Sequence, residues 1–170
     1  SLGDYVVTEA GFAADLGAEK FLNIKCRKAN LSPKAVVIVA TIRALKYHGG
    51  KAHSQLTEED VDALEKGMPN LEKHIESIQS FGLPVVVSVN AFKSDTEAEK
   101  KFIYAHCEKL GIPVALSYGW ADGGKGCVDL AEKVATAAAS YKQKFTPTYS
   151  LEDSPLTKIE KICRNIYGAT

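Results

Sequence analysis

The chain has 170 residues, of which 45% are hydrophobic and 25% charged, and its 21 basic residues balance 21 acidic ones. This composition is typical of a soluble globular protein with enough apolar material for a core. A net charge of zero argues against a large nucleic-acid-binding surface, which would need a basic excess. No apolar run approaches the roughly 20 residues that a membrane-spanning helix needs.

The cysteines and histidines do not follow the spacing of a metal site or a disulfide framework. The four cysteines are widely spread and form no CxxC pair, and the four histidines form no HExxH motif. We therefore predict no metal site and no disulfide scaffold. Free cysteines, and an N-terminus without the pattern of a secretory signal, favour a reducing, cytoplasmic compartment.

Strand-like and helix-like patterns alternate along the chain. A short apolar run begins near residue 5 and ends at Gly11, and a helical pattern follows over residues 17–30. Three continuous apolar runs rich in β-branched residues predict strands that are buried on both faces. These runs cover residues 35–41, 84–90 and 113–119.

Helical patterns fill the spaces between these runs. They cover residues 57–67, 70–82, 94–111 and 124–142, and a last helix closes the chain after Pro155. Thr57, followed three residues later by Asp60, resembles a capping box at the start of the first of them. We expect the charged stretch 96–101 to be a solvated helical face, and His48 with the two glycines after it to form a turn.

Strands separated by helices predict an α/β fold with a mainly parallel sheet of about four strands and flanking helices in Rossmann-like layers. We expect one α/β domain over residues 1–143 and a turn-rich segment with a closing helix over residues 144–170, leading to a missing C-terminal part. The narrow sheet and its abrupt start suggest a piece of a longer protein. Ligands bind such sheets beyond the carboxyl ends of the strands, so the loops there matter most.

The loop "GWADGGKG" after the last expected strand contains the only tryptophan, Trp120. Its spacing nearly matches the phosphate-binding pattern GxxxxGK[ST], but Gly126 stands where a hydroxyl should hold magnesium. A triphosphate cradle is therefore disfavoured. Two alternatives stay open: a flexible turn, or a loop in which Gly123 and Gly124 leave room for a flat ligand to reach the Trp120 ring.

The loop "NAFKSD" after the 84–90 run partly resembles the guanine-binding pattern NKxD. Ala91 replaces the lysine and Asp95 comes two residues late, so we reject a GTPase. Phe92 either tucks into the core or faces the same rim as Trp120. In the loop after the first apolar run, Gly11 and Gly17 bracket Asp15, as in a tight turn with a capping acid or in a close approach of backbone to a nucleotide or anion.

Five long blocks carry a family resemblance in unbroken order over nearly the whole chain. They are "YVVTEAGFAADLGAEKF", "IKCRKANLSPKAVVIVATIRALKYHGG", "FGLPVVVSVNAFKSDTEAE", "WADGGKG" and "KIEKICRNIYGA". Together they resemble formate–tetrahydrofolate ligase. The resemblance implies an enzyme of one-carbon metabolism that joins formate to tetrahydrofolate, giving N10-formyltetrahydrofolate, ADP and phosphate through formyl phosphate.

The resemblance also implies small-molecule partners only: tetrahydrofolate, formate and ATP, with magnesium and a monovalent cation assisting, and no nucleic acid or membrane. Family members are homotetramers of longer subunits whose phosphate loop lies upstream of the matched segment. The chain then corresponds to an internal folate-binding domain, and we expect it to be inactive alone. The alternative is a ligase-like structural or interaction module that no longer catalyses.

Site residues follow from the matched blocks. The family's pterin ring lies between a phenylalanine and a tryptophan, which match Phe92 and Trp120; both are retained here, which favours binding over a purely structural module. The loop with Gly11, Asp15 and Gly17 matches the segment near the adenine side of the nucleotide site. The resemblance assigns no general base in this chain.

Three positions depart from the family pattern. Ala13 stands where most members have glycine, and its methyl group is expected to narrow an approach to the backbone. Ala91 and Lys93 stand where many bacterial members have a basic residue and a proline, so contacts from these two positions are not carried over.

Overall fold

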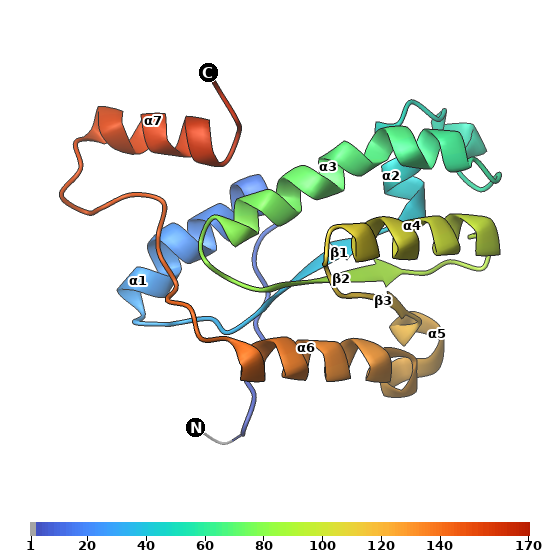
Figure 1. Cartoon of the computed structure of the whole chain (residues 1–170), viewed down its shortest axis with the longest axis horizontal. Coiled ribbons are helices and arrows are strands. Elements are labelled where there is room, and N and C mark those ends of the chain that lie inside the picture. Colours follow the sequence, from blue (N-terminus) through green and yellow to red (C-terminus); the bar gives the residue numbers. More distant parts are fainter. Residues whose placement is uncertain (1–2) are drawn as a thin grey trace. The chain divides into compact units, whose positions relative to one another are not determined.

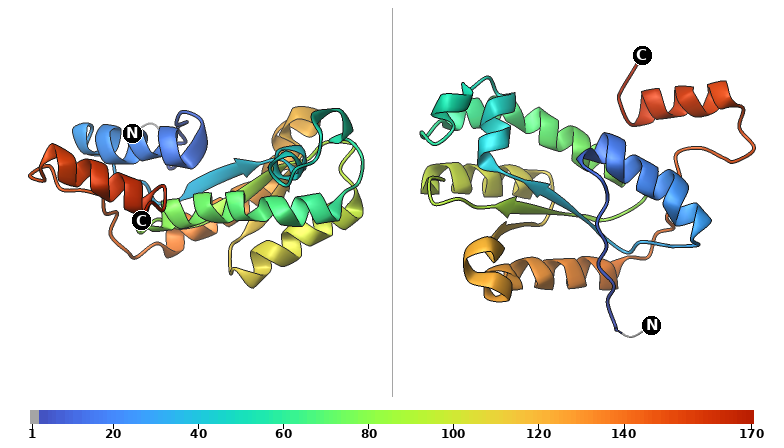
Figure 2. Two further views of the ribbon diagram at one scale, coloured as in Figure 1. Left: turned by 90° about the horizontal axis from the view of Figure 1, so that it is seen from above. Right: turned by 180° about the vertical axis from the view of Figure 1, so that it is seen from behind.

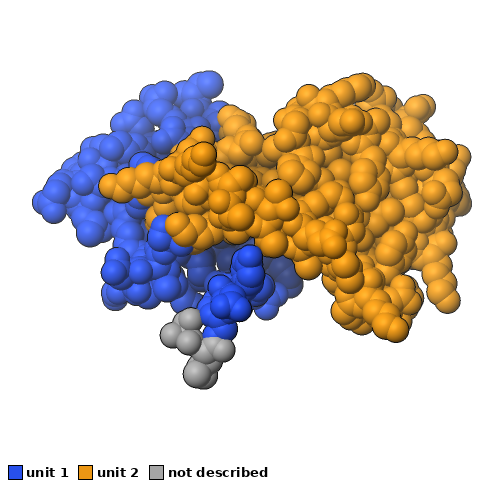
Figure 3. Space-filling model, turned by 60° about the horizontal axis from the view of Figure 1, so that its bottom comes forward, with its two compact units in different colours: residues 1–32, 146–170 blue, residues 33–145 orange. Residues whose placement is uncertain are grey.

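The computed structural model describes residues 3–170. The chain divides into two compact units, coloured separately in Figure 3: a sheet unit of residues 33–145, and a helical unit of residues 1–32 and 146–170.

The sheet unit is built on three parallel strands in the order β1-β2-β3 (Figure 1). The strands are β1 (Val36–Ala40), β2 (Val85–Asn90) and β3 (Val114–Ser117). Val37 pairs with Val86, and Val87 pairs with Val114. The predicted α/β class with a parallel sheet is confirmed. The apolar run near residue 5, expected as a first strand, carries no strand.

Helices connect and flank these strands (Figures 1 and 2). Between β1 and β2 lie α2 (Ile42–His48), the short η3 (His53–Gln55) and α3 (Val61–Gln79). Between β2 and β3 lies α4 (Glu97–Lys109). After β3 come α5 (Gly119–Asp122), η4 (Gly123–Cys127) and α6 (Val128–Ser140). Helix α3 packs on β1 and β2, α4 packs on β3, and α6 packs on β2 and β3.

The three strands are not equally buried. Residues 85–89 of β2 are all buried, so both faces of this central strand are covered. On β1, by contrast, Val37 is 38% exposed and Val39 is 61% exposed. The prediction that this run is buried on both faces was therefore wrong for β1. It is an edge strand, and α6 packs mainly on β2 and β3.

Helix α3 corrects two expectations about residues 57–82. One helix runs from Val61 to Gln79 with Pro69 inside it, where the sequence predicted two shorter helices. Its N-cap is Asp60, whose side chain accepts a hydrogen bond from the Ala63 amide, so the expected cap at Thr57 was wrong. Packing against α2 and the sheet holds the helix together across the proline, which removes one internal hydrogen bond.

Two glycines let α2 and α3 pack backbone against backbone. A Cβ atom on Gly49 would lie 1.7 Å from the Ala63 carbonyl oxygen, and one on Gly67 would lie 1.9 Å from the Leu45 carbonyl oxygen. The turn predicted around residues 48–50 is present, and Gly50 adopts a φ of 95° there. Close packing of α2 fixes the direction in which its first residues leave the end of β1.

The helical unit joins two distant parts of the chain. Its elements are η1 (Ala13–Ala18), η2 (Phe21–Lys25), α1 (Cys26–Lys28) and α7 (Pro155–Asn165), in agreement with the helices predicted over residues 17–30 and after Pro155. The Asn23 side chain donates to the Thr148 hydroxyl at 3.1 Å and accepts from the Thr148 amide at 2.8 Å. Polar contacts of this kind tie the first helices to the closing segment.

Candidate functional site

The carboxyl ends of the three parallel strands meet at one edge of the sheet unit, here called the rim. The rim consists of residues 41–43 after β1, residues 91–96 after β2 and residues 118–127 after β3. The rule that ligands bind at this edge of a parallel sheet singled out the loops of Phe92 and Trp120 from sequence, and it left Phe92 either in the core or at the rim. The structure brings both residues to the rim.

Trp120 presents an exposed ring from a fixed position. The side chain is 64% exposed, yet its indole N–H donates a 3.0 Å hydrogen bond to the carbonyl oxygen of Ala91. Ala91 itself is buried, and its amide donates to the Ser117 carbonyl at 3.1 Å, so this acceptor belongs to the rigid sheet. The tryptophan is therefore oriented before any ligand arrives, and it lies beside the peptide that precedes Phe92.

Phe92 lies neither in the core nor fully exposed at the rim, which were the two alternatives left open by the sequence. The residue is half-buried, and its amide donates to a carboxylate oxygen of Asp95 at 2.8 Å. The guanidinium carbon of Arg43 lies over the ring, 4.1 Å from its centroid. Arg43 also donates to the Ser94 hydroxyl at 2.9 Å. One face of the Phe92 ring is thus covered by Arg43.

A model of the formate–tetrahydrofolate ligase family matches residues 1–170, the whole chain. The chain belongs to the formate–tetrahydrofolate ligase family. The resemblance noted in the sequence is therefore confirmed, and with it the broad assignment to ligases, folate and one-carbon metabolism. The family implies that the parent enzyme uses tetrahydrofolate and ATP, both small molecules.

A buried ion pair lies behind the rim of this ligase-family chain. Lys46 on α2 and Glu99 on α4 are 2.7 Å apart, and their side chains are 1% and 0% exposed. The Lys46 ammonium also donates to the Glu58 carbonyl at 2.6 Å. The Glu99 carboxylate accepts from the amides of Asp60 and Thr96, both at 3.0 Å. The expectation that residues 96–101 form a solvated face was therefore wrong at Glu99.

These contacts decide the charge state of Glu99. Burial by itself would raise the pKa of this carboxyl, but the hydrogen bond from Lys46 and those from the Thr96 and Asp60 amides outweigh it, and the pKa lies below its ordinary value. The carboxylate stays charged and joins α2, through Lys46, to the first turn of α4. Arg43 lies in the first turn of α2, one turn before Lys46, and Phe92 lies in the loop before α4, so the ion pair joins the two elements that carry their contact.

The glycine-rich loop after β3 is shaped by backbone contacts. The Tyr118 amide donates to the Gly126 carbonyl at 3.0 Å, and a Cβ atom on Gly126 would lie 2.7 Å from the Tyr118 carbonyl oxygen. Glycine is thus required where the phosphate-binding pattern has a hydroxyl. Gly123 adopts a φ of 58°, and open space surrounds both Gly123 and Gly124. Their role in ligand access stays a prediction.

The loop expected on the nucleotide side lies in the helical unit. A Cβ atom on Gly17 would lie 1.9 Å from the Gly11 carbonyl oxygen, and the Gly17 amide donates to the Phe12 carbonyl at 3.0 Å. A tight turn alone accounts for the glycine at position 17. The Asp15 carbonyl accepts from the Tyr167 hydroxyl at 2.9 Å. The loop borders an open hollow of about 560 Å³, and its nucleotide role stays a prediction.

Ala13 in this loop has a φ of 65°, in the left-handed region that favours glycine. An L-residue other than glycine pays about 1–2 kcal/mol there. Alanine at position 13 therefore carries a conformational cost. From the sequence we expected only that its methyl group would narrow the approach of a ligand to the backbone.

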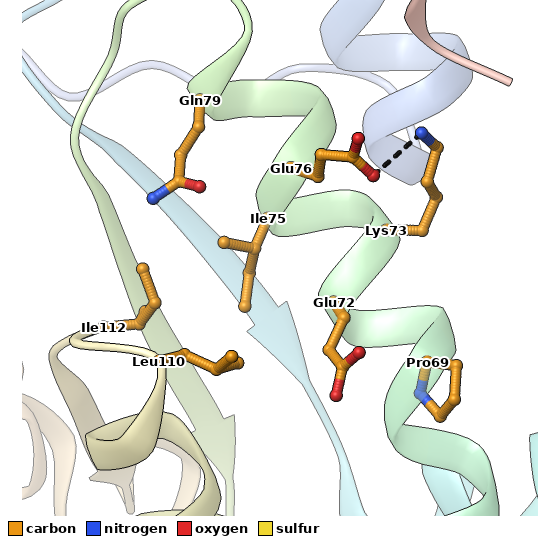
Figure 4. Close-up of a pocket in the computed structure, with 8 residues that line it drawn as sticks. All are labelled: Pro69, Glu72, Lys73, Ile75, Glu76, Gln79, Leu110 and Ile112. Atoms are coloured by element: carbon orange, nitrogen blue, oxygen red, sulfur yellow. Dashed lines mark hydrogen bonds and ion pairs between the residues drawn. The ribbon is translucent and has the colours of Figure 1, made fainter. Parts of the chain in front are cut away.

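A second hollow lies away from the rim (Figure 4). It measures about 370 Å³ and is bordered by α3 and by residues 110 and 112, just before β3 begins. Figure 4 shows Glu72 and Glu76 on its wall, with Glu76 paired to Lys73 at 2.9 Å. It contains no residue that the sequence singled out.

Within residues 3–170, no group of three His, Cys, Asp or Glu side chains could hold a metal ion. No helix in that range has both the length and the apolar character needed to cross a membrane.

Sequence reasoning missed Arg43 and the buried pair of Lys46 and Glu99. Arg43 had a usable signal, because it follows the 35–41 run and the strand-end rule applies to that run as well. The buried pair had none, since Lys46 and Glu99 are far apart in sequence and each looks like a surface charge.

Proposed function

We propose that the rim binds the pterin ring of tetrahydrofolate between Phe92 and Trp120. The observation that carries this proposal is the hydrogen bond from the Trp120 indole to the carbonyl of Ala91, the residue before Phe92. It places two aromatic side chains on one rim and leaves the Trp120 ring exposed. Flat heteroaromatic rings bind well to such faces, and a ring fixed in advance loses little freedom on binding.

Within the parent enzyme, this binding serves the ligase reaction. A formate oxygen attacks the γ-phosphorus of ATP and ADP leaves, which gives formyl phosphate. N10 of tetrahydrofolate then attacks the formyl carbon, phosphate leaves and N10 loses its proton. The part that we assign to residues 33–145 is to hold N10 in position for this attack, which is a matter of proximity and orientation.

Other parts of the proposal rest on the family alone. We place the loop with Gly11, Asp15 and Gly17 on the nucleotide side, and we take the parent to be a cytoplasmic homotetramer. Magnesium and a monovalent cation assist the parent. We assign neither ion to residues 3–170, which offer no cluster of three candidate side-chain ligands.

We expect the 170-residue chain alone to form no N10-formyltetrahydrofolate. Its one near match to a phosphate loop has Gly126 in place of the hydroxyl residue, and that glycine is needed for the turn. An assay of the isolated chain with ATP, formate and tetrahydrofolate checks this expectation. Product above the level without enzyme would contradict it.

The binding proposal is tested by titrating the chain with tetrahydrofolate and following the fluorescence of Trp120, its only tryptophan. We expect saturable quenching that is lost in Phe92→Ala. Measured by calorimetry, Trp120→Ala should weaken binding by about 1–3 kcal/mol, or about 5- to 150-fold in Kd, as for other ring-on-aromatic stacks.

Tyr5→Ala is the matched control, because Tyr5 is an aromatic residue of similar exposure, 67%, outside the sheet unit. It should leave the Kd unchanged. If the chain shows no quenching, or if Trp120→Ala binds as the unmodified chain does, the proposal fails. The ligase-like structural or interaction module is then the better description.

A further inference from the structure

Arg43 makes an unusual set of contacts at the rim. Its guanidinium carbon lies 4.1 Å from the centroid of the Phe92 ring, and one of its terminal nitrogens donates to the Ser94 hydroxyl. Among the described residues it pairs with no carboxylate, and its buried Nε has no hydrogen-bond partner. Arginine usually spends its five donors on carboxylates, phosphates or carbonyls. Here the guanidinium instead lies over a phenylalanine ring.

We propose that Arg43 is a positioning residue for Phe92, which fixes the ring and leaves only its opposite face for the ligand. The inference rests on the proposed function, because it assumes that a flat ring stacks on Phe92. It goes further than the proposed function because it assigns a role to Arg43, which follows β1, whereas Phe92 follows β2. It also implies that the ligand ring stacks on the face of Phe92 that Arg43 does not cover.

The physical reason is preorganisation. A phenylalanine on a loop loses side-chain freedom when a ligand stacks on it, and that loss weakens binding. At this rim the Phe92 amide is held by Asp95 and the ring by Arg43, through attraction between a cation and an aromatic face. Trp120 is held separately by the Ala91 carbonyl. Both stacking surfaces are therefore set by contacts within the protein.

Arg43 is itself held firmly enough to act in this way. It lies in the first turn of α2, whose N-cap Thr41 accepts from the Ala44 amide at 3.1 Å. One turn further along, Lys46 is locked to Glu99 of α4, and α4 begins directly after the Phe92 loop. Arg43 lies at the start of α2 and Phe92 lies just before α4, and the buried pair of Lys46 and Glu99 joins these two helices.

A double-mutant cycle tests the proposal on the 170-residue chain, with tetrahydrofolate binding measured by calorimetry. Arg43→Met keeps an unbranched stem but removes the cation, and we expect it to raise the Kd by about 5- to 10-fold. Arg43→Lys should recover part of the loss, because an ammonium can also lie over the ring. In a Phe92→Ala background, Arg43→Met should change the Kd less than about twofold, since a residue that acts only through Phe92 has nothing left to position.

Two further variants keep the test clear of folding effects. Ser94→Ala removes only the hydrogen bond that orients the guanidinium, and it should weaken binding in the same direction by a smaller factor. Arg27→Met is the matched control, because it removes a similar stack of Arg27 on Tyr149, at 4.7 Å, in the helical unit. It should leave the Kd unchanged.

Each contrary result has a distinct meaning. A full Arg43→Met effect in the Phe92→Ala background shows that Arg43 contacts the ligand itself, and it overturns the positioning role. No effect of Arg43→Met, with Trp120→Ala still weakening binding, overturns the inference and leaves the proposed function standing. No binding by the unmodified chain refutes the proposed function together with the inference.

Discussion

The two units of the chain are stabilised in different ways. Among residues 3–170, all but three of the buried hydrophobic residues lie in the sheet unit, the exceptions being Leu22, Cys26 and Ile166. In the helical unit, large apolar side chains such as Val7, Phe12 and Leu156 are exposed. Burial of apolar surface is the main favourable term in folding, so a unit that buries little of it depends on individual polar contacts. The residues proposed to stack on the pterin ring belong to the unit with the core.

The largest effect is expected from breaking the buried pair of the sheet unit. Glu99→Ala leaves Lys46 charged and buried without its carboxylate, and it should lower the free energy of unfolding by about 3–5 kcal/mol in urea denaturation. The matched control is Glu160→Ala in the helical unit, where Glu160 and Arg164 are both about 60% exposed. That change should have no measurable effect. Equal losses from the two variants would remove the contrast between the units.

Amide hydrogen exchange should reveal the same contrast without any substitution. Residues 86–89 of the central strand β2 are all buried, whereas α7 has no buried residue. We expect amides of β2 to exchange on the order of 100-fold more slowly than those of α7, because local opening of a sparsely packed helix exposes little apolar surface. Similar protection in both elements would show that the helical unit is stabilised by contacts that its burial does not reveal.

Acid should weaken the sheet unit through Glu99. Because its pKa in the folded protein lies below the ordinary value, Glu99 contributes stability that is fully present above the unfolded pKa of about 4.3 and is lost as the pH falls through the folded value. Thermal unfolding followed from pH 6 to pH 3 should show this loss. A Glu99→Gln variant should lack that part of the pH dependence, and an unchanged profile would disprove the assignment.

The smallest effect is expected in the helical unit and has the opposite sign. Ala13→Gly relieves a left-handed backbone conformation, and it should stabilise the loop by about 1 kcal/mol, measured by urea denaturation or by protection from proteolysis. Ala14→Gly is the control, because Ala14 has no positive φ and glycine there should destabilise. Destabilisation by Ala13→Gly would show that the methyl group makes a contact worth more than the strain.

Much of the site could be predicted because its signals are local. Each buried strand appears as a short apolar run, and the ends of parallel strands share one edge, so the sequence alone places the loops of Phe92 and Trp120 at one edge of the sheet. It left open whether the Phe92 side chain lies in the core or at that edge. The loop glycines were also found, although the structure explains Gly17 and Gly126 by contacts within their own turns.

The sequence by itself determined the α/β class, the parallel strands, the family and the two loops that carry the aromatic residues of the rim, because all of these follow from local patterns and long matched blocks. Only the tertiary structure decided that β1 is half exposed, that Arg43 covers Phe92 and that Glu99 is buried against Lys46. Whether a charged side chain meets water or a partner depends on which distant element packs over it. The packing of the whole core determines which element that is, so no short stretch of sequence can reveal it.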